Sequence, residues 1–264
     1  MYMNRRIPAI VQCFLIIGFF SASIKGFSQE RQFIQLRIYH AKDSVQLQQV
    51  SQFLKDAYVP ALHKAGHKMV GVFTHIANDT AIDKRIYVLI PFSSIQQIDN
   101  LSRQWENKKE LMKQGSNYLN ASHNQAPYVR FETILLKAFP YMPKVAKSGL
   151  KGSIKDRIYE LRSYESPTEA YFASKVKMFN QGGEIALFKR LEFNALFYSE
   201  VVFGSHMPNL MYMTSFENMA AREAHWKSFG SDPEWKRLSS LPEYKDNVSH
   251  ITIDFLHATS YSDL

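Results

Sequence analysis

Two short segments with alternating residue types, 33–39 and 158–164, carry the charged side chains best placed to bind a ligand. Their polar residues are Gln35, Arg37, Tyr39, Glu160, Arg162 and Tyr164. Alternate side chains of a β-strand point to opposite faces, so each polar set shares one face of its strand. Because arginine binds carboxylate and carbonyl oxygens, these residues predict a site for a small acidic or carbonyl-bearing ligand.

The role of these polar residues depends on which side of the sheet they face. We expect the apolar residues between them to face helices, which would bring the polar set together in the space between two sheets. The ligand-binding candidates there are Arg37, Tyr39, Glu160, Arg162 and Tyr164. The alternative is a purely structural network, in which Glu160 pairs with an arginine and the tyrosines complete its hydrogen bonds, because buried charges must be paired.

Two histidines are candidates for acid–base chemistry. His75 lies on an expected strand, where it faces either core or pocket, and His206 lies in an expected turn. His63 and His67 are four residues apart, but Gly66 ends the helix between them, so no metal site is expected. The chain has no Gly-rich dinucleotide loop, phosphate-binding loop or Gly-x-Ser-x-Gly motif. We therefore expect no cofactor, and the sequence leaves open whether there is catalysis.

The composition fits a globular protein that does not bind nucleic acid. The 264 residues are 45% apolar and 14% aromatic, enough for one or two cores, and the formal net charge is +8. Loss of Arg5, Arg6 and Lys25 with an N-terminal signal would leave 29 basic against 24 acidic residues, a charge of +5. The basic residues form no long block, which argues against nucleic acid as a partner.

The N-terminus has the pattern of a signal peptide. Arg5 and Arg6 precede an apolar run over residues 7–20 and a region of small residues, and we place cleavage after Ser28. The mature chain would be exported, periplasmic or secreted, without stable membrane insertion. The alternative is an uncleaved membrane anchor. Cys13 is the only cysteine, so an exported chain would rely on its core rather than on disulfides.

The two segments belong to a larger repeat. An offset of 125 residues aligns Leu36-Arg37 with Leu161-Arg162, Ala61-Leu62 with Ala186-Leu187, Lys64 with Lys189 and Tyr87 with Tyr212. In the first unit, hydrophobic periodicity predicts strands at 33–39, 69–76, 85–92 and 129–139 and helices at 44–65 and 94–105. In the second unit, it predicts strands at 158–164, 193–203, 210–216 and 250–257 and helices at 167–191 and 218–229.

Each unit therefore reads β-α-β-β-α-β, the ferredoxin-like order, in an α+β chain. We expect a signal peptide at 1–28, a first repeat at 29–139, a linker at 140–155 and a second repeat at 156–264. The two tandem repeats would pack sheet to sheet, with the helices outside.

The second repeat resembles the NIPSNAP family. The resemblance rests on Tyr159–Tyr164, Tyr212–Phe216, Arg222, Trp226 and the Asp232-Pro233-Glu234-Trp235 segment. It is weaker over 33–139. The resemblance implies a dimeric α/β-barrel fold, here formed by the two units of one chain. It transfers no catalytic mechanism, and an export signal departs from the better-known intracellular or mitochondrial members.

Three functions follow as hypotheses. The first is an exported NIPSNAP domain protein that binds a small ligand between its sheets. The second is a cofactor-independent monooxygenase or isomerase, in which His75 or His206 would act as acid or base. The third is a non-enzymatic module that forms homo-oligomers.

Overall fold

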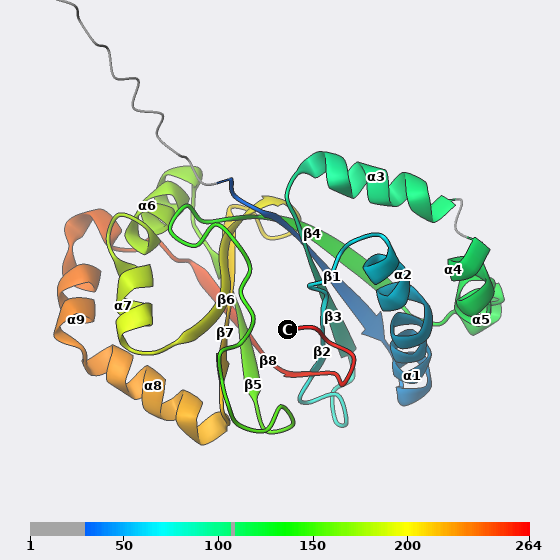
Figure 1. Cartoon of the computed structure of the whole chain (residues 1–264). Helices are drawn as coiled ribbons and strands as arrows, with labels where there is room; N and C mark the ends of the chain where they lie inside the picture. The colour runs from blue at the N-terminus through cyan, green and yellow to red at the C-terminus, as the bar shows by residue number, and fades with distance from the viewer. Residues whose placement is uncertain (1–29, 107–108) are drawn as a thin grey trace, which may run out of the picture.

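The computed structural model describes residues 30–106 and 109–264, which form a closed barrel of eight antiparallel strands with helices on two sides (Figure 1). The predicted signal peptide, residues 1–28, lies outside the described residues. The strands are β1 (Phe33–Ala41), β2 (Gly71–His75), β3 (Lys84–Phe92), β4 (Arg130–Ala138), β5 (Ile158–Glu165), β6 (Asn194–Phe203), β7 (Asn209–Phe216) and β8 (His250–Ala258).

The helices follow the predicted positions closely. They are α1 (Ser44–Phe53), the π-helical turn η1 (Leu54–Tyr58), α2 (Val59–Lys64), α3 (Ile95–Glu106), α4 (Lys109–Gln114), α5 (Ser116–Leu119), η2 (His123–Gln125), α6 (Glu169–Phe179), α7 (Glu184–Arg190), α8 (Met219–Ser231), α9 (Pro233–Ser240) and η3 (Pro242–Tyr244). No helix among the described residues is both long and apolar enough to span a membrane.

Local sequence signals explain where the helices begin and end. The Asp43 carboxylate accepts a hydrogen bond from the backbone N–H three residues on, at 2.8 Å, and Asn218 does the same at 2.9 Å. Asp232 caps α9, with proline at the first helical position. Gly66 ends α2 at φ 96°, and Gly183 separates α6 from α7 at φ 94°, a left-handed conformation that glycine adopts without strain.

The strand order around the barrel is β1-β3-β2-β8-β5-β7-β6-β4. Each half of the chain contributes four neighbouring strands, and the halves join where β2 pairs with β8 and β4 pairs with β6. Closure leaves no strand edge unpaired in the barrel. The prediction of a mixed α/β fold with an inner barrel and outer helices is thus confirmed, and the two sheets meet edge to edge.

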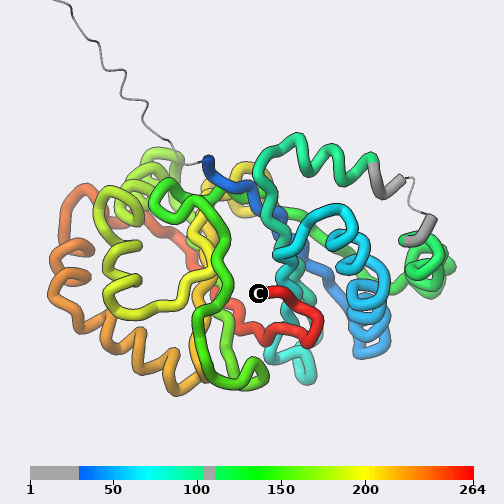
Figure 2. The backbone as a smooth tube through the Cα atoms, viewed as in Figure 1, coloured from blue at the N-terminus to red at the C-terminus, as the bar shows by residue number. Residues whose placement is uncertain are grey.

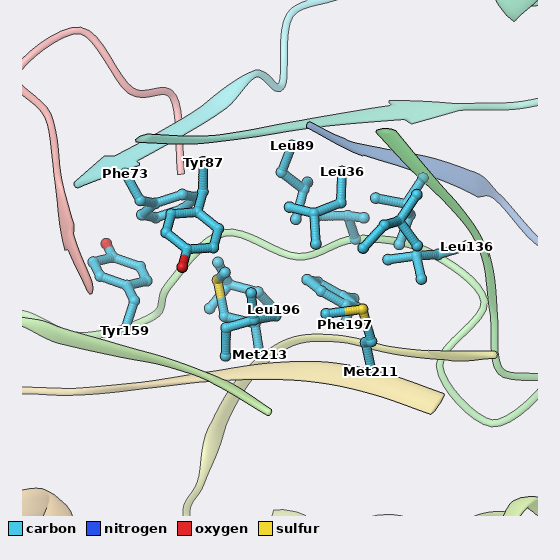
Figure 3. Close-up of a cluster of buried hydrophobic side chains, with 14 of the residues drawn as sticks. Leu36, Phe73, Tyr87, Leu89, Leu136, Tyr159, Leu196, Phe197, Met211 and Met213 are labelled. Carbon is cyan, nitrogen blue, oxygen red and sulfur yellow. The ribbon is translucent and has the colours of Figure 1, made fainter. Parts of the chain in front are cut away.

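The barrel interior is filled by large apolar side chains from all parts of the sheet (Figure 3). They include Leu36, Phe73, Tyr87, Leu89, Leu136, Tyr159, Leu196, Phe197, Met211 and Met213. The predicted faces of β1 and β5 were therefore wrong, because their apolar residues point into the barrel. Eight strands enclose a space just wide enough for side chains to fill, and this space takes the mainly apolar faces of β1 and β5.

The helices cover the outer face of the barrel and form two further cores with it (Figure 2). Tyr39 of β1 packs beneath α1, η1 and α2 in the first half. Tyr164 of β5 packs in the second half against an aromatic cluster that includes Phe179, Phe188 and Phe229. The polar residues of β1 and β5 thus lie between sheet and helices, where helical side chains can reach them.

Candidate functional site

The carboxylate of Glu160 accepts four side-chain hydrogen bonds, and this side chain is fully buried on the helix side of β5. Its Oε1 accepts hydrogen bonds from Arg162 Nε at 2.6 Å and Arg222 Nη2 at 2.9 Å. Its Oε2 accepts from Arg222 Nε at 2.9 Å and Trp226 Nε1 at 2.8 Å. Burial raises the pKa of Glu160, but these donors and the arginine charges outweigh it and hold the pKa below its ordinary value.

Arg162 extends this network to two tyrosines. Its Nη1 donates to the Tyr164 hydroxyl at 2.9 Å, and the Tyr164 and Tyr212 hydroxyls lie 2.8 Å apart. The guanidinium also lies 3.7 Å from the centre of the Trp226 ring. These hydrogen bonds join the side chains of Glu160, Arg162 and Tyr164 in one network, and Glu160 connects that network to α8. This is the arrangement of the structural alternative considered for these residues.

Arg37 occupies the corresponding place on β1 but has very different surroundings. Its guanidinium lies 4.7 Å from the centre of the Phe131 ring and 5.6 Å from that of Tyr58. Nη1 donates to the Tyr39 hydroxyl at 3.3 Å, and the buried Nε has no hydrogen-bond partner. Among the side chains that the structure describes, those of residues 30–103 and 111–264, no carboxylate pairs with Arg37. The residue that corresponds to Glu160 is Gln35.

Two tyrosines near Arg37, Tyr58 and Tyr118, keep their hydroxyl protons at neutral pH. Burial raises the pKa of Tyr58 to about 12, although the positive charge of Arg37 acts in the opposite direction. Burial likewise raises the pKa of Tyr118, against the same charge. Burial lowers the pKa of Arg37 itself, but the Tyr58 and Tyr39 oxygens outweigh it and keep the group protonated. The cluster thus combines one positive charge with phenolic O–H donors, a combination suited to an oxyanion.

A pocket of about 430 Å³ lies next to this cluster, between α1 and α5. Its lining is Gln49, Gln52, Phe53, Asp56, Gln114, Gly115, Asn117, Tyr118 and Pro127. The rings of Phe53 and Tyr118 stack at 3.9 Å and 4°. Tyr118 forms part of the pocket wall, and its ring packs on Tyr128, which packs in turn on Tyr39, the hydrogen-bond partner of Arg37. This chain of contacts connects the pocket to the buried cation.

The two histidine candidates lie elsewhere. His75 lies beside Asp254, with Nε2 3.5 Å from Oδ1, and Arg85 Nη1 is 3.1 Å from the same oxygen. The backbone N–H of Ala77 donates to His75 Nδ1 at 3.1 Å, so Nδ1 is not free to take a proton. His206 has an exposed side chain with Nδ1 3.2 Å from Glu165. The structure brings neither histidine into contact with Arg37.

Sequence reasoning missed several parts of this arrangement. Arg222 and Trp226 supported the family resemblance but were not placed with Glu160, because the helix position opposite a strand residue cannot be read from periodicity. Tyr58 and Tyr118 were missed for the same reason. The offset of 125 also paired Tyr87 with Tyr212, but Tyr87 lies opposite Ile38 and Tyr212 opposite Arg162, on different faces.

Among the described residues, no group of three or more His, Cys, Asp or Glu is arranged to hold a metal ion.

The fold is similar to that of solved oxygenase-like barrels. A proposed monooxygenase from Lactobacillus acidophilus NCFM superposes with a TM-score of 0.56 at 11% identity, covering 87% of this chain and 94% of that one. A proposed monooxygenase from Fusobacterium nucleatum gives 0.54 at 8% identity, covering 89% and 95%. An anthrone oxidase-like protein gives 0.54 at 7% identity, covering 88% and 93%. The fold that the chain shares with these proteins is a mixed α/β fold built on a closed barrel.

Residues 159–263 match the NIPSNAP family model. The resemblance expected from the motifs is therefore confirmed over these residues, and the second half of the chain is called the NIPSNAP half below. None of the curated proteins compared with the chain matches it.

Proposed function

We propose that this chain binds a small, partly apolar ligand with an acidic or carbonyl oxygen, in the pocket next to Arg37. The observation that carries the proposal is the contrast between two equivalent arginines. Arg162 is neutralised by Glu160, whereas Arg37 has no carboxylate partner within the described residues. A buried cation without a counter-charge is costly, and an anionic ligand oxygen would compensate it.

The surroundings of Arg37 define the ligand class. Aromatic surface is present on both sides of the cluster, because Phe53 and Tyr118 stack at the pocket wall and the Phe131 ring lies 4.7 Å from the Arg37 guanidinium. Small-molecule sites commonly combine apolar walls with a few convergent polar groups. The ligand would place its ring against Phe53 and Tyr118 and its oxygen toward Arg37 and the tyrosines. Of the predicted ligand-binding residues, Arg37 and Tyr39 keep that role in this proposal.

Replacement of Arg37 tests the binding proposal. Native mass spectrometry of purified residues 29–264 should show a co-purifying small molecule, or saturable binding of the anthrone dithranol, whose oxygens have the proposed chemistry. Arg37→Met should weaken that binding by about 10–100-fold, because it removes a charge-assisted hydrogen bond of about 1.5–3 kcal/mol. Arg103→Met is the matched control, since the Arg103 side chain is 75% exposed and its guanidinium pairs with Asp99. Equal binding by wild type and Arg37→Met would contradict the proposal.

A second candidate is a cofactor-independent oxygenase or isomerase. It is favoured by the oxygenase-like fold relatives and by the oxyanion-stabilising character of the Arg37 cluster. An anthrone would lose a C–H proton to a base, and Arg37 would stabilise the enolate. Reaction of the enolate with O₂ gives the quinone and water, which balances without a cofactor. Asp56 is the carboxylate in the pocket wall. Consumption of O₂ with dithranol, lost in Arg37→Met and Asp56→Asn, would distinguish turnover from binding.

We further propose that the chain consists of a signal peptide at 1–28, two ferredoxin-like repeats at 29–139 and 156–264, and a connection at 140–155. The repeat proposal is supported by the strand order 4-1-3-2 within each half. Export is supported by the pattern of Arg5, Arg6 and the apolar run after them. N-terminal sequencing of protein from the periplasm or medium should begin at Gln29. An intact N-terminus in the membrane fraction would indicate the anchor instead.

A further inference from the structure

A second pocket, of about 680 Å³, lies on the NIPSNAP half of the chain, far in sequence from Arg37. It lies among α7, the start of β6, α8 and residues 141–150. Its lining is Tyr141, Met142, Ala146, Lys147, Gly149, Leu150, Ile185, Lys189, Glu192, Phe193, Asn194, Ala195, Tyr198 and His225. We propose that this pocket binds a small aromatic anion, and that Lys147, Lys189 and His225 recognise its charge.

One wall of the pocket is the segment expected to be a linker. It is held along β6, where the backbone N–H of Ala146 donates to the Leu196 carbonyl at 2.8 Å and that of Gly149 donates to Asn194 Oδ1 at 2.9 Å. Figure 1 shows this green segment running in front of β6 and β7. These two hydrogen bonds lie on either side of Lys147 and hold its backbone against β6.

The histidine in the pocket is held in one orientation. His225 Nδ1 lies 3.0 Å from the Leu191 carbonyl oxygen, which can only accept, so Nδ1 carries the proton. Its ring also packs edge-on against Phe193, at 5.5 Å between ring centres. Nε2 of the neutral ring is then the acceptor, and in the protonated ring it is a second donor. In many histidines that bind a ligand, a hydrogen bond to one ring nitrogen fixes the orientation of the ring, and the other nitrogen contacts the ligand.

The rest of the lining defines the ligand. Phe193, Tyr141 and Tyr198 supply aromatic surface, and Tyr198 is almost fully buried with a hydroxyl that has no hydrogen-bond partner among the described residues. Lys147 and Lys189 contribute two positive charges against the single carboxylate of Glu192. Glu192 follows the end of α7 in a left-handed conformation, φ 59°, and the backbone N–H of Phe193 donates to the Phe188 carbonyl at 3.0 Å, which closes the helix and holds Glu192 at the pocket wall. A flat ring with one anionic group matches this combination of walls and charges.

Binding of naphthalene-1-sulfonate, followed by calorimetry and by the His225 ring resonances, tests this inference. The wild type should bind the sulfonate, and Lys147→Ala/Lys189→Ala should weaken binding about tenfold or more. Lys236→Ala, an exposed lysine outside the pocket, should leave binding unchanged, and uncharged 1-naphthalenemethanol should bind about tenfold more weakly. The His225 signals should shift on binding. No binding up to millimolar concentration, or equal binding by the double variant, would overturn the inference.

This site is independent of the one proposed at Arg37, and the same titration separates them. Arg37→Met should leave the affinity for naphthalene-1-sulfonate unchanged. If Arg37→Met abolishes sulfonate binding and the double lysine variant does not, the probe occupies the first-half pocket, and the proposal for the second pocket fails. Near-ultraviolet circular dichroism of each variant shows whether its fold is intact, so that loss of binding can be assigned to the pocket.

Discussion

Glu160→Ala should destabilise the folded protein by about 3–5 kcal/mol, because it leaves two arginines buried without their shared carboxylate. The side chain has no exposed surface and accepts four hydrogen bonds at 2.6–2.9 Å. Removing it also leaves Trp226 Nε1 without its acceptor. Urea unfolding followed by tryptophan fluorescence measures the loss, and the emission of the folded variant should change because the indole loses its hydrogen bond.

A matched control uses the same arginine. Glu223 pairs with Arg222 Nη1 at 2.8 Å, but its side chain is 64% exposed, so Glu223→Ala should cost less than about 1 kcal/mol. Equal losses in the two variants would contradict the argument that burial makes Glu160 important. In the wild type, the Glu160 contribution is complete above its ordinary pKa of 4.5 and is lost as the pH falls through the lower folded-state pKa. The Glu160→Ala variant should lack this acid-dependent loss.

The sequence predicted the element order because the hydrophobic period changes clearly between strands and helices. It could not predict the faces of β1 and β5, because an alternating strand has two faces and periodicity does not say which one meets the barrel interior. Ile34 and Leu36 fit either environment. Only the closed barrel decides between them, since large side chains such as Phe73, Leu89 and Phe197 already fill the middle of its interior.

The candidate site was predictable in part. Arg37 and Arg162 were identified by residue type, and the alternative of a paired network for Glu160 was available from charge pairing alone. What the sequence could not show was that a carboxylate pairs with Arg162 whereas none of the described carboxylates pairs with Arg37. That difference depends on Arg222 and Trp226, which follow Glu160 by more than sixty residues and reach it only because α8 packs on β5. Contacts of such sequence separation leave no local pattern.

The second large effect concerns the buried ion pair in the NIPSNAP half. Lys175 Nζ lies 2.9 Å from Glu184 Oε2, and both side chains are almost completely buried, at 4% and 3% exposure. Lys175→Met should destabilise the protein by about 3–5 kcal/mol, because Glu184 is left buried without its cation. Adding Glu184→Leu should recover most of that loss, since a well-packed apolar pair replaces a buried ion pair at little or no cost. Chemical denaturation of both single variants and the double variant measures the coupling.

The pH dependence of the Lys175→Met variant separates charge from packing. Burial raises the pKa of Glu184 above its ordinary value, and Lys175 partly opposes this shift. Without the lysine the folded-state pKa rises further, so the folded protein binds a proton that the unfolded chain releases. The deficit of Lys175→Met relative to the wild type should therefore grow as the pH rises from the folded-state pKa of Glu184 in the wild type toward the higher folded-state pKa in the variant, and shrink on acidification. Lys177→Met on the same helix, where the Glu243 pair is exposed, should change stability little at any of these pH values. A deficit in Lys175→Met that does not vary with pH would show that lost packing, rather than the uncompensated carboxylate, causes the destabilisation.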